Sequence, residues 1–413
     1  MMESGMPYDD KAFRAFVNEH RKDDVRQLVL KYGNRKDLDV RETAVQISGY
    51  QMACAKLPLW AETQGVVFPP HISMEQCSSQ RTAEYKANLI KNIIKDDAPR
   101  ITDLTAGFGV DATIMARAFD ATKLTIVEHL PQLCEIAKHN LPLFGLNDAE
   151  VVCDETENVL PMLQHQNLIF IDPARRDSHG GRTYAIADCT PNVALLAPQL
   201  LDKADFVMVK LSPMLNISDV EAGLPNITDI HVVSVDGECK ELLALMHRDA
   251  VGEVRIRTVN IIVNGMSEYS FVRSEERSAT CVYATQVLRY IYEPNASLMK
   301  AAPFAGLSMR YGVQKLHPDS HLYTSGEFVA DFPGRVFEVK YVATFNKKEL
   351  RQTLKGISRA NITVRNFPLT APQLRAKLHL AEGGEDYIFA TTLQPTNQHI
   401  LVIGRKILVK GEE

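Results

Sequence analysis

The chain lacks several features that would assign it to a common class of protein. No apolar run in its 413 residues reaches the roughly 18 residues needed to cross a membrane. Residues 1–10 are polar and acidic, without the basic and apolar regions of a signal peptide. The seven cysteines are scattered and form no Cys-x-x-Cys pair, which argues against a disulfide framework or a zinc ribbon. These absences predict a cytoplasmic protein with reduced thiols, no membrane contact and no structural metal.

The sequence also lacks the excess of basic residues that is typical of general nucleic-acid binders, because its formal net charge is −5. The charge is unevenly distributed, however. Between Lys347 and Lys377 there are eight Lys or Arg residues and one acid, Glu349. A local positive field of this kind can bind phosphates despite a negative total charge.

Length and periodicity predict four regions. Residues 1–70 have apolar side chains at helical spacing and end in the linker-like segment Phe68-Pro69-Pro70. Residues 71–248 alternate short apolar strands with helical patterns, as in an α/β domain with a parallel sheet. Residues 249–334 have shorter strands and one helical stretch at 296–310, which suggests a small ferredoxin-like α+β domain. Residues 335–413 follow the order β-α-β-α-β-β, with a helix expected at 347–358.

Three segments of the α/β region are the most informative, because each is an apolar run followed by glycines or a carboxylate. They are 102–112 (Thr-Asp-Leu-Thr-Ala-Gly-Phe-Gly-Val-Asp-Ala), Leu124–His129 and Ile169–Arg176. In a doubly wound sheet, the carboxyl ends of the strands line the crevice where ligands bind. Glycines allow a close approach of the backbone to a ligand, and the next helix offers free N–H groups. Glu128, 19 residues after Gly109, is placed to accept hydrogen bonds from both hydroxyls of a ribose. The three segments therefore predict an adenosine-bearing cofactor.

Two cofactors fit this pattern. Gly107-x-Gly109-x-x-Ala112 with an acid about 20 residues later matches the fingerprint of NAD-binding folds. Asp103 favours the other, because a carboxylate would repel a pyrophosphate but attract the amino group of S-adenosylmethionine. An NAD-dependent oxidoreductase is kept as the alternative.

Taken together, Asp-x-Thr-Ala-Gly-x-Gly, the acid after the second strand and Asp-Pro after the fourth resemble the class I S-adenosylmethionine-dependent methyltransferases. The resemblance covers residues 71–248 and implies a Rossmann-like sheet of seven strands, the last of them antiparallel. Strand candidates at 230–234 and 242–246 fit that last pair, because the link between them is too short for a crossover helix. The resemblance implies that S-adenosyl-L-methionine is held by Gln76, Ser79, Asp103, Thr105, Ala106, Gly107, Gly109, Asp111, Glu128, His129 and Asp154.

The pair Asp172-Pro173 lies where class I enzymes present groups to the methyl acceptor. Amino-group methyltransferases usually continue with a second proline and an aromatic residue, but here Ala174 and Arg175 follow. Arg175 and Arg176 could clamp a phosphate or carboxylate, because guanidinium groups bind such anions bidentately. Alternatively, an arginine pairs with a nearby aspartate and only shapes the loop. No cysteine lies directly after the fourth or fifth strand, and Cys189 is the nearest, which argues against carbon methylation through a cysteine nucleophile.

A second catalytic pattern is a possible tetrad of Lys86, Asp172, Lys210 and Glu241. These residues occupy a helix entering the α/β region and the ends of three of its strands. The arrangement resembles ribose 2′-O-methyltransferases, in which a lysine helps to deprotonate the hydroxyl and carboxylates tune it. The alternative is that these lysines and carboxylates face solvent.

The last region resembles a THUMP-like RNA-binding domain fused to methyltransferases in some bacterial proteins. In its expected helix, Lys347, Arg351, Lys355 and Arg359 fall at i, i+4 spacing and would form one cationic stripe. The predicted function is methylation of RNA, either tRNA or rRNA, at a base nitrogen or a ribose 2′-oxygen. A non-catalytic protein that binds S-adenosylmethionine or RNA is the further alternative.

Overall fold

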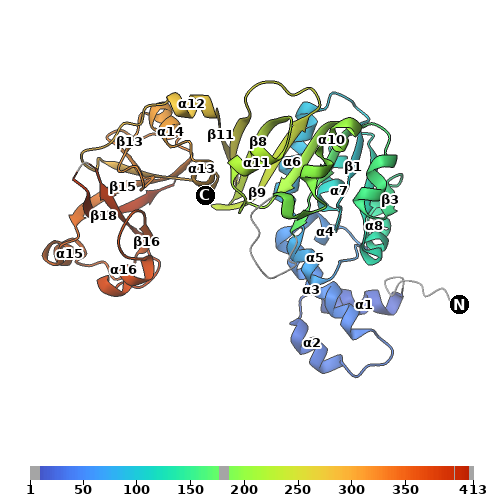
Figure 1. The fold of residues 1–413 in the computed structure, drawn as a ribbon. Helices are drawn as coiled ribbons and strands as arrows, with labels where there is room; N and C mark the ends of the chain where they lie inside the picture. Colours follow the sequence, from blue (N-terminus) through green and yellow to red (C-terminus); the bar gives the residue numbers. More distant parts are fainter. Residues whose placement is uncertain (1–9, 176–185, 395, 409–413) are drawn as a thin grey trace. The chain divides into compact units, whose positions relative to one another are not determined.

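The computed structural model describes residues 10–175, 186–394 and 396–408 (Figure 1). Within it the chain forms two compact units. The first contains residues up to 227 together with 244–251, and the second contains 228–243 together with 252 onward. Arg176 lies outside the described residues.

The first unit begins with helices, as expected for residues 1–70, and the helical part continues to residue 93. Its helices are α1 (Lys11–His20), α2 (Val25–Tyr32), α3 (Val40–Lys56), α4 (Pro58–Glu62), α5 (His71–Gln76) and α6 (Gln80–Ile93). Asp10, Asp24 and Asp39 start the first three helices, because each side chain accepts hydrogen bonds from backbone N–H groups of the first turn. Pro58 ends the pattern of α3 and occupies the first turn of α4, where a missing N–H has no cost.

The segment at residues 67 and 68, where the expected linker begins, forms backbone hydrogen bonds with side chains of two helices. Gln46 on α3 donates to the Phe68 carbonyl and accepts from the Phe68 N–H, both at 2.8 Å. Asn140 on α8 (Pro131–Leu143) holds the N–H and the carbonyl of Val67 in the same manner, at 2.9 and 2.8 Å. The helical region therefore packs with the α/β domain through two buried amides that the local sequence pattern does not reveal.

The α/β sheet has the strand order β11-β10-β8-β9-β7-β4-β1-β2-β3. Strands β1 (Arg100–Asp103), β2 (Lys123–Glu128), β3 (Glu150–Cys153), β4 (Gln166–Ile171) and β7 (Ala204–Leu211) run parallel. Residues 168–171 of β4 are at most 1% exposed, as expected for a strand covered on both faces. The helices between these strands are α7 (Val110–Ala116), α8, α9 (Thr156–Val159) and α10 (Val193–Lys203), with α11 (Ile217–Gly223) after β7.

The expected antiparallel pair of strands follows these parallel strands in the sequence. Strands β8 (Ile227–Val235) and β9 (Glu238–His247) are joined by Asp236 and Gly237, whose φ angles are +50° and +84°. Two linking residues with positive φ define a hairpin turn, so the two strands are antiparallel. The sheet then continues beyond seven strands, because β10 (Arg255–Ile262) pairs in parallel with β8 and in antiparallel with β11 (Gly265–Val272).

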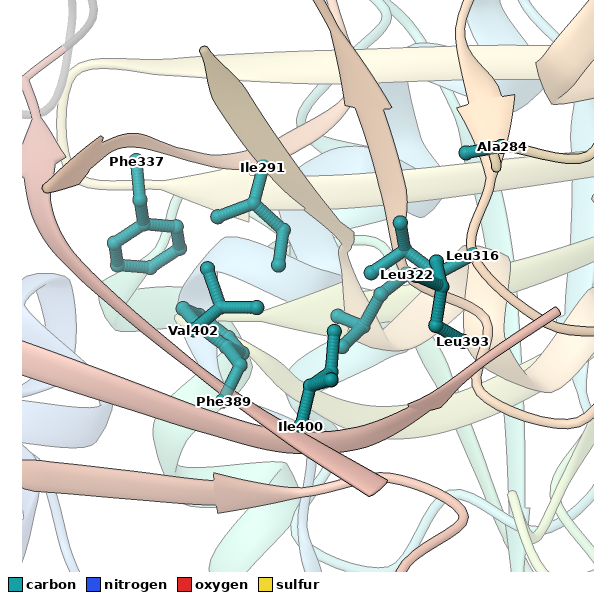
Figure 2. Packing of buried hydrophobic residues seen from close by; sticks show 9 residues of the cluster. All are labelled: Ala284, Ile291, Leu316, Leu322, Phe337, Phe389, Leu393, Ile400 and Val402. Carbon is teal, nitrogen blue, oxygen red and sulfur yellow. The ribbon is translucent and has the colours of Figure 1, made fainter. Parts of the chain in front are cut away.

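The C-terminal sheet has the order β13-β14-β12-β15-β18-β17-β16. It joins the expected strands β15 (Gly334–Thr344), β16 (Asn361–Val364), β17 (Asp386–Leu393) and β18 (Gln398–Ile407) with three further strands, β12 (Tyr290–Pro294), β13 (Gln314–Lys315) and β14 (Tyr323–Ser325). Strand β12 pairs with β15, so both predicted C-terminal domains contribute to one sheet. They also share one core, in which Ile291 and Leu322 pack with Phe337 and Phe389 (Figure 2).

Two expected helices of this unit are shorter than predicted. The stretch 296–310 is split into α13 (Ala296–Ala301) and α14 (Phe304–Tyr311), because Ala302 is left-handed and Pro303 follows. The helix expected at 347–358 ends earlier, as α15 (Lys347–Thr353), and Gly356 has a φ of +91°. Helices α12 (Arg273–Ser278) and α16 (Ala371–Leu378) complete the unit. Throughout the described ranges, no helix combines the length and hydropathy needed to span a membrane.

Candidate active site

The glycine loop after β1 is held by backbone contacts on both sides. Gly107 and Gly109 have φ angles of +55° and +77°, which favour glycine over any residue with a Cβ. The Ala106 N–H donates to the carbonyl of Val127 on β2, at 3.0 Å. A Cβ added at Gly107 would meet no heavy atom within 4 Å, so the requirement for glycine comes from the backbone conformation. The loop is therefore preformed and open toward its outer side.

Glu128, at the end of β2, is oriented toward this loop. One carboxylate oxygen accepts the Gly107 N–H and the other accepts the Leu130 N–H, both at 2.9 Å. The side chain is 6% exposed, and the ring of His129 lies 3.1 Å from it. The oxygen that accepts the Gly107 N–H can accept a second hydrogen bond from a hydroxyl, whereas the other oxygen also faces the Nδ1 atom of His129.

Asp103, at the end of β1, is a buried carboxylate without an ion pair among the described residues. Burial raises its pKa well above the ordinary value of 3.8, and the nearby carboxylates of Asp111 and Asp172 add to the effect. The N–H of Thr105, 3.0 Å away, opposes the shift only partly. An ammonium group placed beside Asp103 would relieve this unfavourable charge.

Asp172, at the end of β4, is tied to the glycine loop and to the neighbouring strand. Its N–H donates to the Thr105 hydroxyl at 2.6 Å, and its carboxylate lies 2.5 Å from the Nζ atom of Lys210 on β7. Thr105 thus connects the carboxyl ends of β1 and β4. Pro173 is buried directly after Asp172, and β5 (Ala174–Arg175) follows.

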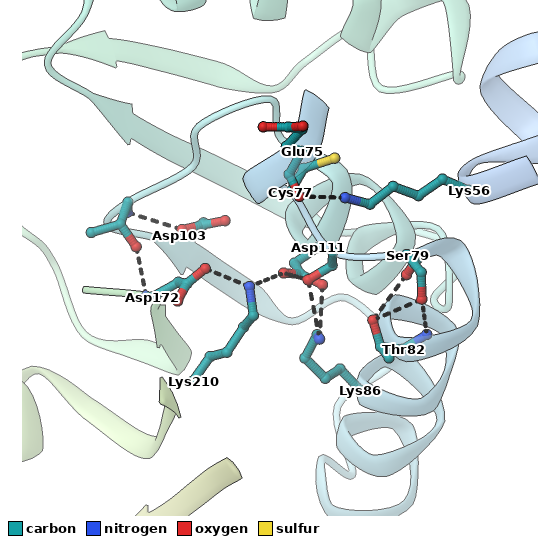
Figure 3. A network of polar contacts seen from close by, with 12 residues as sticks. Lys56, Glu75, Cys77, Ser79, Thr82, Lys86, Asp103, Asp111, Asp172 and Lys210 are labelled. Atoms are coloured by element: carbon teal, nitrogen blue, oxygen red, sulfur yellow. Dashed lines mark hydrogen bonds and ion pairs between the residues drawn. The ribbon is translucent and has the colours of Figure 1, made fainter. Parts of the chain in front are cut away.

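Asp111, in the first turn of α7, is the centre of the buried charges (Figure 3). Its carboxylate is 3.1 Å from the Nζ atom of Lys86 on α6 and 3.9 Å from that of Lys210, and it accepts the Ser78 hydroxyl at 2.6 Å. Burial disfavours the charge of Asp111, but the two ammonium groups and Ser78 outweigh it and lower its pKa. Lys86, Asp111, Lys210 and Asp172 therefore form an alternating chain of charges.

This chain differs from the predicted tetrad in one member. Sequence reasoning grouped Lys86 and Lys210 with Asp172 and Glu241, and assigned Asp111 to the cofactor. The structure brings Asp111 between the two lysines. Glu241 is buried in β9 but belongs to the second unit, so its place in a tetrad stays a prediction.

The remaining predicted cofactor residues occupy the surroundings of the loop. Ser79 caps α6 by accepting the Thr82 N–H at 3.2 Å, and Gln76 ends α5. Asp154, after β3, is exposed and accepts hydrogen bonds from Asn158 and the Glu155 N–H, which lower its pKa in that order. Whether these residues contact a cofactor stays a prediction.

Sequence reasoning missed Ser78 and Lys56 as members of this network. Lys56 on α3 donates to the carbonyls of Met74 and Glu75, at 2.9 and 2.7 Å, and burial lowers its pKa. Lys56 comes from the helical region before residue 71, where no local motif marks it, and Ser78 lies between the predicted cofactor residues Gln76 and Ser79. Only the three-dimensional packing of α3 and α5 reveals their position.

The cationic stripe predicted on the second unit is smaller than expected. Lys347 and Arg351 lie on α15, whereas Lys355 and Arg359 follow its end. Arg359 donates to the Glu382 carbonyl at 3.2 Å and is therefore engaged in holding a loop. Lys347, Lys348, Arg351 and Lys355 are exposed.

The strand order, the glycine loop and the carboxylates at the ends of β1, β2 and β4 define an α/β methyltransferase fold. A solved structure described as a "putative methyltransferase from Porphyromonas gingivalis W83" is 32% identical to this chain, with a TM-score of 0.85. The match covers 96% of this chain and 98% of that one. The chain therefore belongs to the same family as the Porphyromonas gingivalis protein.

Two further comparisons concern parts of the chain. Family models described as a ferredoxin-like domain and as THUMP domain-like match residues 290–333 and 334–406. The protein-L-isoaspartate O-methyltransferase of Thermotoga maritima is 22% identical over 133 residues, 32% of this chain. This chain spans 42% of the length of that relative. The chain therefore combines a methyltransferase fold with a C-terminal THUMP-like domain.

Proposed function

We propose that the protein transfers a methyl group from S-adenosyl-L-methionine to RNA. The observation that carries the proposal is the pair of buried carboxylates, Asp103 and Glu128, that flanks the glycine loop. Among the residues that the structure describes, none forms an ion pair with Asp103, which suits an ammonium group, and Glu128 faces the glycine loop with its carboxylate. S-adenosylmethionine has an ammonium group and ribose hydroxyls on one molecule, and NAD has no ammonium group to offer Asp103.

The residues present therefore fit this cofactor. Asp103 would hold the amino group, Glu128 the ribose hydroxyls, and Gly107 and Gly109 would allow close contact with the backbone. When bound, the cofactor supplies an electrophilic methyl group. Asp172, joined to the loop through Thr105, orients the acceptor beside it.

An RNA acceptor is supported by the second unit. The THUMP-like match covers residues 334–406, and exposed Lys347, Lys348, Arg351 and Lys355 lie within it. Phosphate contacts from such side chains position a nucleic acid without reading its sequence. The cationic surface lies in the second unit, and in this proposal it binds RNA while Asp172 of the first unit faces the methyl acceptor.

Mass spectrometry of modified nucleosides tests the proposal. RNA from cells with and without the gene should differ in one methylated nucleoside, and expression of wild-type protein should restore it. Expression of the Asp172→Ala variant should fail to restore it. Identical nucleoside profiles in all four samples would contradict RNA as the acceptor. Binding of NAD in place of S-adenosylmethionine, measured by calorimetry, would contradict the cofactor.

A further inference from the structure

The helical region before the α/β domain packs against the glycine loop of the first unit. The ring of Trp60 on α4 is buried, and its centroid lies 6.2 Å from that of Phe108. Phe108 lies between the two glycines of the loop. The ring of Phe68 lies 6.4 Å from the same phenylalanine. The start of α4 is therefore held close to the loop that is proposed to bind the cofactor.

Lys56, the last residue of α3, lies four positions before Trp60 and binds the end of α5. Its Nζ atom donates to the carbonyls of Met74 and Glu75 in the last turn of α5, at 2.9 and 2.7 Å (Figure 3). An ammonium group has three N–H donors, and these carbonyls take two of them. The third has the thiol of Cys77 beside it, which is a weak acceptor. An anionic ligand would be a stronger acceptor for this N–H.

Lys56 differs from the two other lysines of the network in having no carboxylate partner. Lys86 lies 3.1 Å from Asp111, and Lys210 lies 2.5 Å from Asp172. Among the residues that the structure describes, no acid forms an ion pair with Lys56. Burial lowers the pKa of Lys56, the charge of Lys210 adds to this effect, and neighbouring acidic groups oppose it only partly. An anion placed beside Lys56 would relieve this unfavourable charge.

We infer that Lys56 binds the α-carboxylate of the methionine part of S-adenosylmethionine, so that the helical region forms one side of the cofactor site. The inference rests on the proposed function and adds a residue to its binding site.

The chemistry of the ligand requires such a cation. In an α-amino acid the ammonium and the carboxylate are attached to one carbon atom, so a ligand held by Asp103 at its ammonium presents its carboxylate nearby. Lys210 acts electrostatically on both Asp103 and Lys56, so the two groups lie in one neighbourhood. Gln76 and Ser79, which are also predicted to contact the cofactor, come from the segment that Lys56 holds.

A cycle of two proteins and two ligands tests the inference. Wild type and Lys56→Met are titrated by calorimetry with S-adenosylmethionine and with its decarboxylated analogue, which keeps the adenosine, sulfonium and ammonium groups. We expect the substitution to weaken binding of S-adenosylmethionine by about tenfold to a hundredfold, the range for loss of one hydrogen bond between charged groups. Binding of the analogue should change by less than about threefold, because the cycle isolates the contact with the carboxylate.

The cycle also detects a purely structural role, because Lys56→Met removes two donors from the end of α5. Such a role would weaken the binding of both ligands equally, and that result would overturn the inference. Equal affinities of wild type for the two ligands would overturn it as well, because the carboxylate would then make no favourable contact. Lys36→Met, which changes an exposed lysine of the same region, is the matched control and should bind both ligands as wild type does.

Trp60, the one tryptophan of the chain, reports whether the helical region stays packed on the glycine loop. Its emission spectrum and the thermal midpoint of Lys56→Met should match those of wild type. If this variant fails to fold, Lys56→Gln decides, because its amide keeps two N–H donors for the carbonyls of α5 without the charge. The same selective loss is expected, and unchanged affinity for S-adenosylmethionine is the opposing result.

The titrations also separate this inference from the proposed function. If wild type binds S-adenosylmethionine but Lys56→Met changes only the KM for RNA, Lys56 serves the acceptor. The inference is then wrong, whereas the proposed function stands. If wild type binds neither ligand, both are wrong.

Discussion

The buried carboxylate of Asp103 should make both protein stability and cofactor affinity depend on pH. Its folded-state pKa is raised, mainly by burial, so the folded protein binds this proton more tightly than the unfolded chain does. Stability from this group is therefore present at low pH, and it is lost as pH rises from 3.8 through the raised value. A bound ammonium group would favour the ionised carboxylate of Asp103 and lower its pKa.

Binding of S-adenosylmethionine should therefore release a proton at pH values below the raised pKa of Asp103. Calorimetry in buffers with different ionisation enthalpies measures this release directly. The Asp103→Asn variant should bind the cofactor more weakly and lose the pH-dependent proton release. Equal proton release in the variant would assign the effect to another group.

A substitution at Glu128 tests the part of the site that is proposed to bind the ribose of the cofactor. Replacement by Ala removes hydrogen bonds to the ribose and to the glycine loop, at a cost of about 1.5–3 kcal/mol. Affinity for S-adenosylmethionine should fall by about one to two decades, at tenfold per 1.4 kcal/mol. Glu157→Ala, which changes an exposed glutamate on α9, is the matched control and should bind normally. A normal affinity in Glu128→Ala would refute this role.

At the residue scale, the sequence identified positions at strand ends better than it identified their partners. Asp103, Glu128 and Asp172 follow apolar runs, so the fold pattern alone locates them at one edge of the sheet. The contacts of Asp111 depend on how α6 packs on α7, and Ser78 is 33 residues away in sequence. No local pattern encodes such a pairing, and the assignment of Asp111 to the cofactor stays a prediction.

At the scale of elements, the side-chain amides of Gln46 on α3 and Asn140 on α8 hydrogen-bond to two adjacent backbone positions, 68 and 67. These bonds connect α3 with α8. Asn140→Ala would leave the buried N–H and carbonyl of Val67 without their partner. The cost in free energy of unfolding should be roughly 2–4 kcal/mol, because each unsatisfied buried group costs about 1–3 kcal/mol. Denaturant unfolding measures it. Asn92→Ala, on the exposed side of α6, should change stability by less than about 0.5 kcal/mol, and equal effects would contradict this account.

The elements themselves were largely predictable. Short apolar runs located the parallel strands of the first sheet and β15 to β18 of the second, but not β12, β13 and β14, and the short link before β9 indicated its antiparallel direction. Helix lengths were harder to predict. The cationic i, i+4 spacing continues to Arg359, but α15 ends at Thr353, because Leu354 and Gly356 have non-helical backbone angles. The pairing of β12 with β15 could not be predicted either, because β12 is short and its partner residues are 40 to 48 positions away in the sequence.

At the scale of the whole molecule, the cations of the second unit should dominate the salt dependence of RNA binding. The K347E/R351E variant removes two exposed cations, and each phosphate contact on a single strand contributes about 0.7 to the slope of log affinity against log salt. The slope should therefore flatten by about 1.4. The K91E/K95E variant carries the same change in net charge on the first unit and is the matched control. An equal slope in wild type and K347E/R351E would show that α15 does not contact RNA.

Methyl transfer in a purified system tests the central claim most directly. Wild-type protein is incubated with S-adenosylmethionine carrying a labelled methyl group and with RNA from cells that lack the gene. We predict that label enters one nucleoside of that RNA and that Asp172→Ala abolishes the transfer while its affinity for S-adenosylmethionine stays within a few-fold of wild type. No label in RNA, or full transfer by Asp172→Ala, would contradict the account.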